Sequence, residues 1–180
     1  MTTDLDFITD TDLRKKIENS IEYVFVLFEK SKNEKEKDLF REETHRVIIL
    51  YIISIIEAVL LYVYKKRNEE LTKLEYKFVT TIPNEYKNEK EKDFPVVIAV
   101  QKKIKKQDHE IGLFELVNFF KDKKLMMEKT VEKILEINDI RNTFHFNKSR
   151  SSVICDIKHV ESAFSLLVYV IEKVPKVFKK

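Results

Sequence analysis

The 180-residue sequence is poor in the residues that form tight turns and cross-links. It has one glycine, three prolines, one cysteine and no tryptophan. β-rich and doubly wound folds usually carry more glycine at their turns, so this scarcity predicts helices joined by polar loops. The single Cys155 excludes an internal disulfide framework and a cysteine-based zinc site, and it favours a reduced, cytoplasmic location. The length fits one helical domain over residues 1–180.

A strong excess of charge of one sign is also missing, because 34 basic residues face 31 acidic ones. The two signs are mostly interspersed, which is typical of solvated helix surfaces and does not by itself indicate a nucleic-acid ligand. The segment Met1 to Asp12 is acidic and polar, without the basic start and apolar core of a signal peptide.

Apolar residues recur every three or four positions over most of the chain, which predicts an all-α bundle of about five to six helices with its core between residues 12 and 174. Cap residues ahead of these stripes, such as Asp156, support the predicted helix starts. The expected helices cover residues 12–30, 47–64, 113–120, 127–146 and 157–174.

The segment Val47 to Tyr64 is the longest apolar run, with sixteen hydrophobic residues out of eighteen, interrupted only by Ser54 and Glu57. A membrane span needs about 20 apolar residues, and a carboxylate near its middle costs a few kcal/mol in lipid. We therefore interpret this segment as a helix buried in a bundle or in a dimer interface. A membrane-attached helical protein is the alternative.

The apolar residues between positions 71 and 106 follow neither the helical nor the strand period clearly. Leu71, Leu74 and Phe78 fit a helix, whereas Tyr76, Phe78 and Thr80 alternate as in a strand. The segment is expected to form either a short hairpin or an extra helix.

The segment Asp139 to Phe146 combines three side chains suited to phosphate chemistry, Arg141, Asn142 and His145. Arginine can clamp a phosphate, asparagine can orient it, and histidine transfers protons near neutral pH. Arg141 and His145 are four residues apart and would share one face of a helix that continues to Phe146. Arg141 also continues an apolar stripe, so its charge needs a partner, and we predict that Glu57 lies close to it.

A purely structural interpretation of the same residues is that Arg141 and Glu57 form a core ion pair, while His145 faces the negative end of its helix. The other histidines, His45, His109 and His159, match no zinc motif in their spacing. We expect them to be surface or interface residues.

The segment INDIRNTFHF (residues 137–146), near the end of a helix in an all-helical chain, resembles the HEPN superfamily. The resemblance implies a helical bundle and a homodimeric, metal-independent endoribonuclease, often a toxin or phage-defence effector, that needs no cofactor. It implies that His145 is the general acid or base, that Arg141 stabilises the phosphate and that Asn142 orients the phosphate or the histidine. RNA would supply the nucleophile, its own 2′-hydroxyl.

The spacing within the motif departs from the family pattern, which usually has four to six residues between arginine and histidine. Here three residues intervene, and Phe146 stands at the commonest histidine position. The alternative is thus a catalytically inactive module that binds a nucleotide, RNA or a protein. Lys148 and Arg150 could add phosphate contacts, and the resemblance implies an antitoxin or nucleotidyltransferase partner and no membrane.

Overall fold

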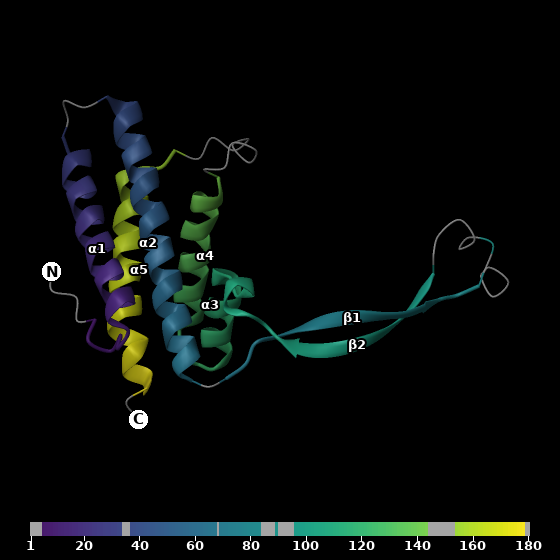
Figure 1. Ribbon diagram of the computed structural model, residues 1–180. Coiled ribbons are helices and arrows are strands. Elements are labelled where there is room, and N and C mark those ends of the chain that lie inside the picture. Colours follow the sequence, from purple (N-terminus) through teal and green to yellow (C-terminus); the bar gives the residue numbers. More distant parts are fainter. Residues whose placement is uncertain are drawn as a thin grey trace. The chain divides into compact units, whose positions relative to one another are not determined.

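Helices and one β-hairpin follow one another in the computed structural model, which describes residues 5–33, 37–67, 69–83, 89, 96–143 and 154–178 (Figure 1). The chain divides into two compact units. The helical unit comprises Met1–Asn68 and Gly112–Lys180, and the hairpin unit comprises Glu69–Ile111.

The helical unit contains five α-helices within the described residues, which confirms the expectation of a mostly helical protein. Their bounds agree with the apolar stripes except at two ends, where α2 begins earlier and α4 ends earlier than predicted. They are α1 (Thr11–Ser31), α2 (Asp38–Lys66), α3 (Leu113–Asp122), α4 (Glu128–Asn142) and α5 (Ile157–Lys173), followed by a short 3-10 helix, η4 (Pro175–Phe178).

Helix α2 is the centre of this unit, because it contacts each of the other four α-helices (Figure 1). One side of α2 is fully buried, and each such side chain contributes about 1.5–3 kcal/mol relative to an exposed one. The side chains with no solvent exposure are Ile48, Ile49, Ile52, Ile53, Ile56, Val59 and Leu60. The long apolar run thus supplies much of the core of the bundle.

The opposite side of α2 is less covered. Val47, Leu50 and Tyr51 keep 36%, 40% and 37% of their surface exposed. Helix α2 is also long and apolar enough to cross a membrane by length and composition, with 56% of its most apolar window buried. Core helices of soluble proteins pass the same test, so this property is weak evidence for a membrane span.

Local side-chain chemistry explains several helix ends. The Asp10 carboxylate accepts a hydrogen bond from the Leu13 amide at 3.0 Å and caps α1. The Asp156 carboxylate accepts one from the His159 amide at 3.1 Å and caps α5, as expected from the sequence. Beyond α3, Lys124 adopts φ 57°, a left-handed conformation that glycine usually occupies after a helix.

The hairpin unit resolves the ambiguity of residues 71–106 in favour of strands. β1 (Thr72–Thr81) and β2 (Val97–Lys105) pair antiparallel, with Thr72 opposite Lys105 and Tyr76 opposite Gln101. An irregularity in the register lies between Phe78 and Thr80. A 3-10 helix, η3 (Asp108–Glu110), follows β2, and Glu110 forms an ion pair with Lys73 of β1.

Candidate functional site

The predicted phosphate-handling motif begins at the carboxyl end of α4. This helix ends at Asn142, and the predicted continuation to about Phe146 falls mostly on residues outside the described part of the chain. Thr143 is its C-cap: its amide donates to the carbonyls of Asp139 and Ile140 at 3.2 and 3.1 Å, and its hydroxyl donates to the Ile140 carbonyl at 2.7 Å. These bonds satisfy carbonyl groups in the last turn of the helix.

His145, Lys148 and Arg150 lie outside the described residues. The argument that Arg141 and His145 share one helix face required a helix that continues through position 145. Because α4 ends at Asn142, the helix itself does not set the geometry between these two side chains. Asn142 is the last residue of α4 and is half-buried.

Arg141 lies close to Glu57, as predicted. Nη1 of Arg141 is 4.0 Å from Oε2 of Glu57, and it donates a hydrogen bond to Oδ1 of Asn138 at 3.3 Å. Both charged side chains retain 30% of their exposure. The pair therefore joins α4 to the central helix at a partly solvated position and is not a fully buried core ion pair.

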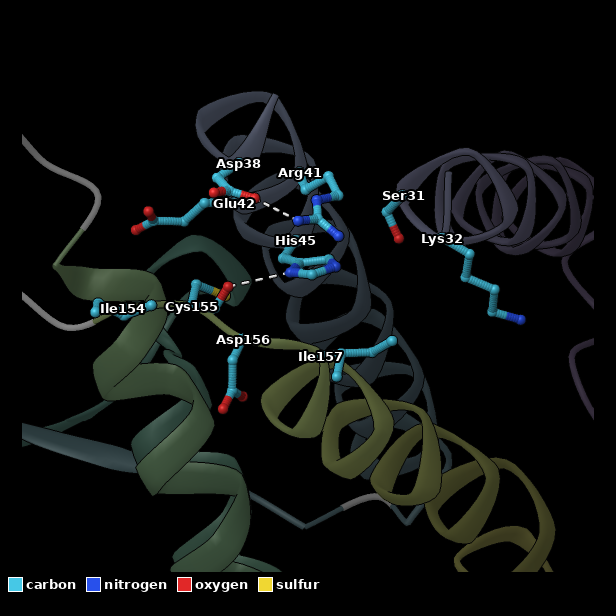
Figure 2. A pocket seen from close by; sticks show the side chains of 10 residues that line it. All are labelled: Ser31, Lys32, Asp38, Arg41, Glu42, His45, Ile154, Cys155, Asp156 and Ile157. Atoms are coloured by element: carbon cyan, nitrogen blue, oxygen red, sulfur yellow. Dashed lines mark hydrogen bonds and ion pairs between the residues drawn. The ribbon is translucent and has the colours of Figure 1, made fainter. Parts of the chain in front are cut away.

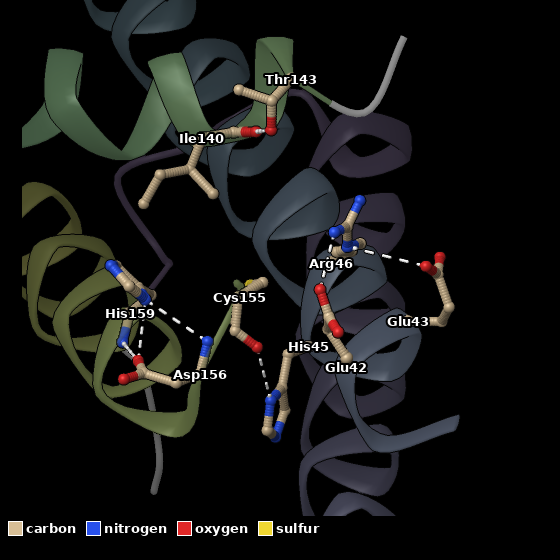
Figure 3. Close-up of polar contacts among 9 residues, drawn as sticks. All are labelled: Glu42, Glu43, His45, Arg46, Ile140, Thr143, Cys155, Asp156 and His159. Carbon is tan, nitrogen blue, oxygen red and sulfur yellow. Dashed lines mark hydrogen bonds and ion pairs between the residues drawn. The ribbon is translucent and has the colours of Figure 1, made fainter. Parts of the chain in front are cut away.

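The structure reveals a second polar cluster, centred on His45 in the second turn of α2 (Figure 2). His45 is only 8% exposed, so the expectation of a surface or interface residue was wrong. Its Nδ1 lies 3.1 Å from the backbone oxygen of Cys155 (Figure 3). A carbonyl can only accept, so Nδ1 donates this hydrogen bond, and Nε2 has no partner among the described residues.

The sequence contains a signal for this burial in the spacing of His45 from the apolar residues that follow it. His45 precedes Ile48, Ile49 and Ile52 by three, four and seven residues, so it extends the buried stripe of α2 by one turn. A histidine at such a position ties α2 to the segment before α5.

Ten residues around His45 line a cavity of about 410 Å³. Several of its charges are already paired: Arg41 bonds to Asp38, and Asp156 caps α5 and lies 2.7 Å from Nδ1 of His159. The other lining residues are Ser31, Lys32, Glu42, His45, Ile154, Cys155 and Ile157. The pairing of these charges favours a structural role for the cluster.

The titration properties of this cluster agree with that role. Burial raises the pKa of the Cys155 thiol to about 12, so the thiol stays protonated and unreactive at neutral pH. The hydrogen bond to Glu42, at 2.7 Å, is the largest cause that raises the pKa of Arg46 above its ordinary value (Figure 3). Within the described part of the chain, no group of three or more His, Cys, Asp or Glu side chains is arranged to hold a metal ion.

Comparisons of the chain with protein-family models, with curated proteins and with solved structures find no match. The site must therefore be judged on its own residues.

Proposed function

We propose that the helical unit is a HEPN-like, metal-independent endoribonuclease that acts as a cytoplasmic homodimer, as a toxin or phage-defence effector. Arg141 would bind the scissile phosphate, Asn142 would orient it and His145 would transfer the proton. An antitoxin or a nucleotidyltransferase is the kind of protein partner that this proposal implies.

The observation that carries the proposal is the state of Arg141. Its guanidinium is held at the end of α4 by Glu57 and Asn138, yet 30% of the side chain stays exposed. A guanidinium has five N–H donors, and among the described residues only one hydrogen bond from Arg141 is formed. Donors thus remain for a phosphate, and the side chain is already oriented.

The chemistry needs only a few groups. The 2′-hydroxyl of RNA attacks the adjacent phosphorus and loses its proton, and the P–O5′ bond breaks as the leaving oxygen gains one. The products are a 2′,3′-cyclic phosphate and a 5′-hydroxyl. A histidine with a pKa near neutrality serves as acid or base, and a fixed cation stabilises the charge on the phosphate oxygens.

The homodimer is supported by the exposed side of α2. Val47, Leu50 and Tyr51 of α2 and Tyr23 and Val26 of α1 are large exposed apolar side chains, and the rings of Tyr23 and Tyr51 pack at 5.2 Å between centroids. Exposed apolar side chains that gather on a surface mark interaction sites. A second copy of the chain would cover it.

A binding module without cleavage is the second candidate, and the end of α4 at Asn142 favours it. The described helix ends before position 145, and three residues separate Arg141 from His145 where the family usually has four to six. In this case Arg141 would hold a nucleotide, RNA or a protein partner without a reaction.

A ribonuclease assay on the full chain tests the first proposal. Fluorescent single-stranded RNA is incubated with wild type, Arg141→Ala and His145→Ala in the presence of EDTA, and product ends are assayed for the cyclic phosphate. Removal of the phosphate-stabilising cation or of the acid–base group should lower the rate about 10²–10³-fold. Arg14→Ala is the matched control, because Arg14 of α1 is 34% exposed and forms an ion pair with Asp6, which precedes this helix.

Equal rates for Arg141→Ala and Arg14→Ala would refute the assigned role of Arg141. Absence of cleavage by the wild type, with RNA binding that depends on Arg141, would support the binding module.

A further inference from the structure

The hairpin unit exposes both faces of a long two-stranded ribbon. β1 has ten residues and β2 has nine, whereas most strands have five or six. Apart from Lys73 and Ile104, which are half-buried, every residue of the two strands is exposed. An isolated hairpin has no second layer on which to bury its apolar side chains, so apolar residues on it are available to a ligand.

One face of the ribbon carries a row of large apolar side chains. Alternate residues of a strand point to the same face, so Leu74, Tyr76 and Phe78 lie together at intervals of roughly 6.8 Å. Their exposed fractions are 56%, 66% and 59%. Nε2 of Gln101, directly opposite on β2, donates a hydrogen bond to the Tyr76 hydroxyl at 3.0 Å and steadies the ring.

The charge of the ribbon complements a polyanion. β1 contains two lysines and one glutamate, and β2 contains three lysines, so the strands carry a net charge of +4, of which the pairs Lys73–Glu110 and Lys105–Glu70 neutralise two. Lys103 and Lys105 lie opposite Leu74 and Thr72 and thus on the same face as the aromatic rings. Lys105 is paired with Glu70 at 2.9 Å, which leaves Lys103 as the cation beside Leu74 and Tyr76 without an ion pair among the described residues.

Exposed aromatic rings interleaved with lysines are the surface that binds single-stranded nucleic acid. Bases stack on the rings, and the cations contact the phosphates. A duplex hides the faces of its bases and offers less to such a surface. We infer that the face formed by Leu74, Tyr76, Phe78, Gln101 and Lys103 binds single-stranded RNA. The inference takes RNA as the ligand from the proposed function, but it requires no cleavage.

Binding is measured with a fluorescein-labelled 12-residue oligouridylate whose 2′-hydroxyls are methylated, so that the probe cannot be cleaved. Fluorescence anisotropy is recorded on the full chain as wild type, as Tyr76→Ala/Phe78→Ala and as Phe114→Ala. Phe114 lies on α3 and is 64% exposed, so its removal is a matched control for the loss of an exposed ring. The double variant should bind at least 10-fold more weakly, and the control should bind as the wild type does.

A second comparison separates stacking and charge from damage to the hairpin. Tyr76→Phe keeps the ring and should retain binding within about 2-fold, as stacking needs only the π-face. Lys103→Gln should reduce the slope of log affinity against log salt by about 0.7, the value for one phosphate contact on a single strand. Lys129→Gln on α4 is the control for the loss of an exposed lysine and should leave the slope unchanged.

Equal affinity of wild type and the double variant would overturn the inference, as would a wild type that does not bind the probe. If sedimentation shows that the double variant loses a dimer while its RNA affinity is unchanged, the face is covered by a second copy of the chain, and the inference is also wrong. The proposed nuclease is tested separately, because Arg141→Ala should lower the cleavage rate about 10²–10³-fold without lowering affinity for the methylated probe more than about 3-fold.

Discussion

The ion pair between Glu57 and Arg141 offers the sharpest test of whether this arginine serves the fold or a ligand. A double-mutant cycle with Glu57→Gln, Arg141→Gln and the double variant isolates the coupling free energy between the two side chains. Glutamine removes the charge in each case and keeps most of the side-chain volume.

The expected coupling follows from the distance and the exposure. Two unit charges at 4.0 Å attract by about 1 kcal/mol in water and by about 4 kcal/mol at an effective dielectric constant of 20. With 30% of each side chain exposed, part of this attraction is screened, and measured exposed pairs give about 0.2–1 kcal/mol. We therefore expect a coupling of about 0.5–1 kcal/mol, well below the 3–5 kcal/mol lost when one partner of a buried pair is removed.

The coupling is read from urea denaturation followed by circular dichroism at the helical band, which reports on the helical unit. The cycle for Arg46 and Glu42, whose atoms are 2.7 Å apart with 25% and 28% exposure, is the positive control and should give the larger value. A coupling above about 3 kcal/mol for Glu57 and Arg141, with RNA cleavage unaffected in either single variant, would refute the reasoning. Arg141 would then be a structural residue.

Three further predictions concern the fold. His45→Ala should lower the free energy of unfolding by about 2–3 kcal/mol, because the buried carbonyl of Cys155 loses its donor and a cavity forms; an effect below 0.5 kcal/mol in urea denaturation would contradict this. Lys124→Gly should raise the free energy of unfolding by about 0.5 kcal/mol, because glycine has no Cβ to strain at φ 57°. A lower melting temperature of this variant would contradict the prediction. The Cys155 thiol has a folded pKa of about 12 against an ordinary 9.0, so its contribution to stability is complete below pH 9 and is lost as the pH rises towards 12. The free energy of unfolding of Cys155→Ala should therefore fall less steeply with pH over that range than that of the wild type. An identical slope for the two proteins would disprove the assignment.

Periodicity alone was enough to predict most of the helical unit. The stripes of α1 and α5 reproduce the observed helices to within one or two residues, since each buries one face along its whole length. The start of α2 was missed because its first turns, from Asp38 to Glu43, are highly charged and carry no apolar period. The period of apolar residues cannot predict helical turns whose side chains are charged and exposed to solvent.

The remaining errors have local causes. The end of α4 at Asn142 was not predicted, because the sequence offers no glycine or proline there to mark it. The burial of His45 follows from its three- and four-residue spacing to Ile48 and Ile49, whereas its spacing to the other histidines carries no information about burial. Between Leu71 and Thr80 the apolar residues fit both a helical and a strand period, so the sequence alone does not decide between them. The strand forms because this segment pairs with β2. In contrast, the proximity of Glu57 to Arg141 was predictable, because each is the lone charge on an otherwise apolar stripe.

The surroundings of Arg141 bear on how strongly the proposed site attracts a phosphate. The carboxyl end of α4 carries about half a negative charge from the helix dipole, and the Glu57 carboxylate adds a full one 4.0 Å from the guanidinium. These charges offset part of the attraction between Arg141 and a phosphate, and the Arg141 of a second copy would bring the same two charges with it. Further cations must therefore come from residues outside this ion pair, and Lys148 and Arg150 follow in the sequence. The proposal thus gives these two cations a part in phosphate binding, beside the dimer that the exposed apolar side of α2 can form.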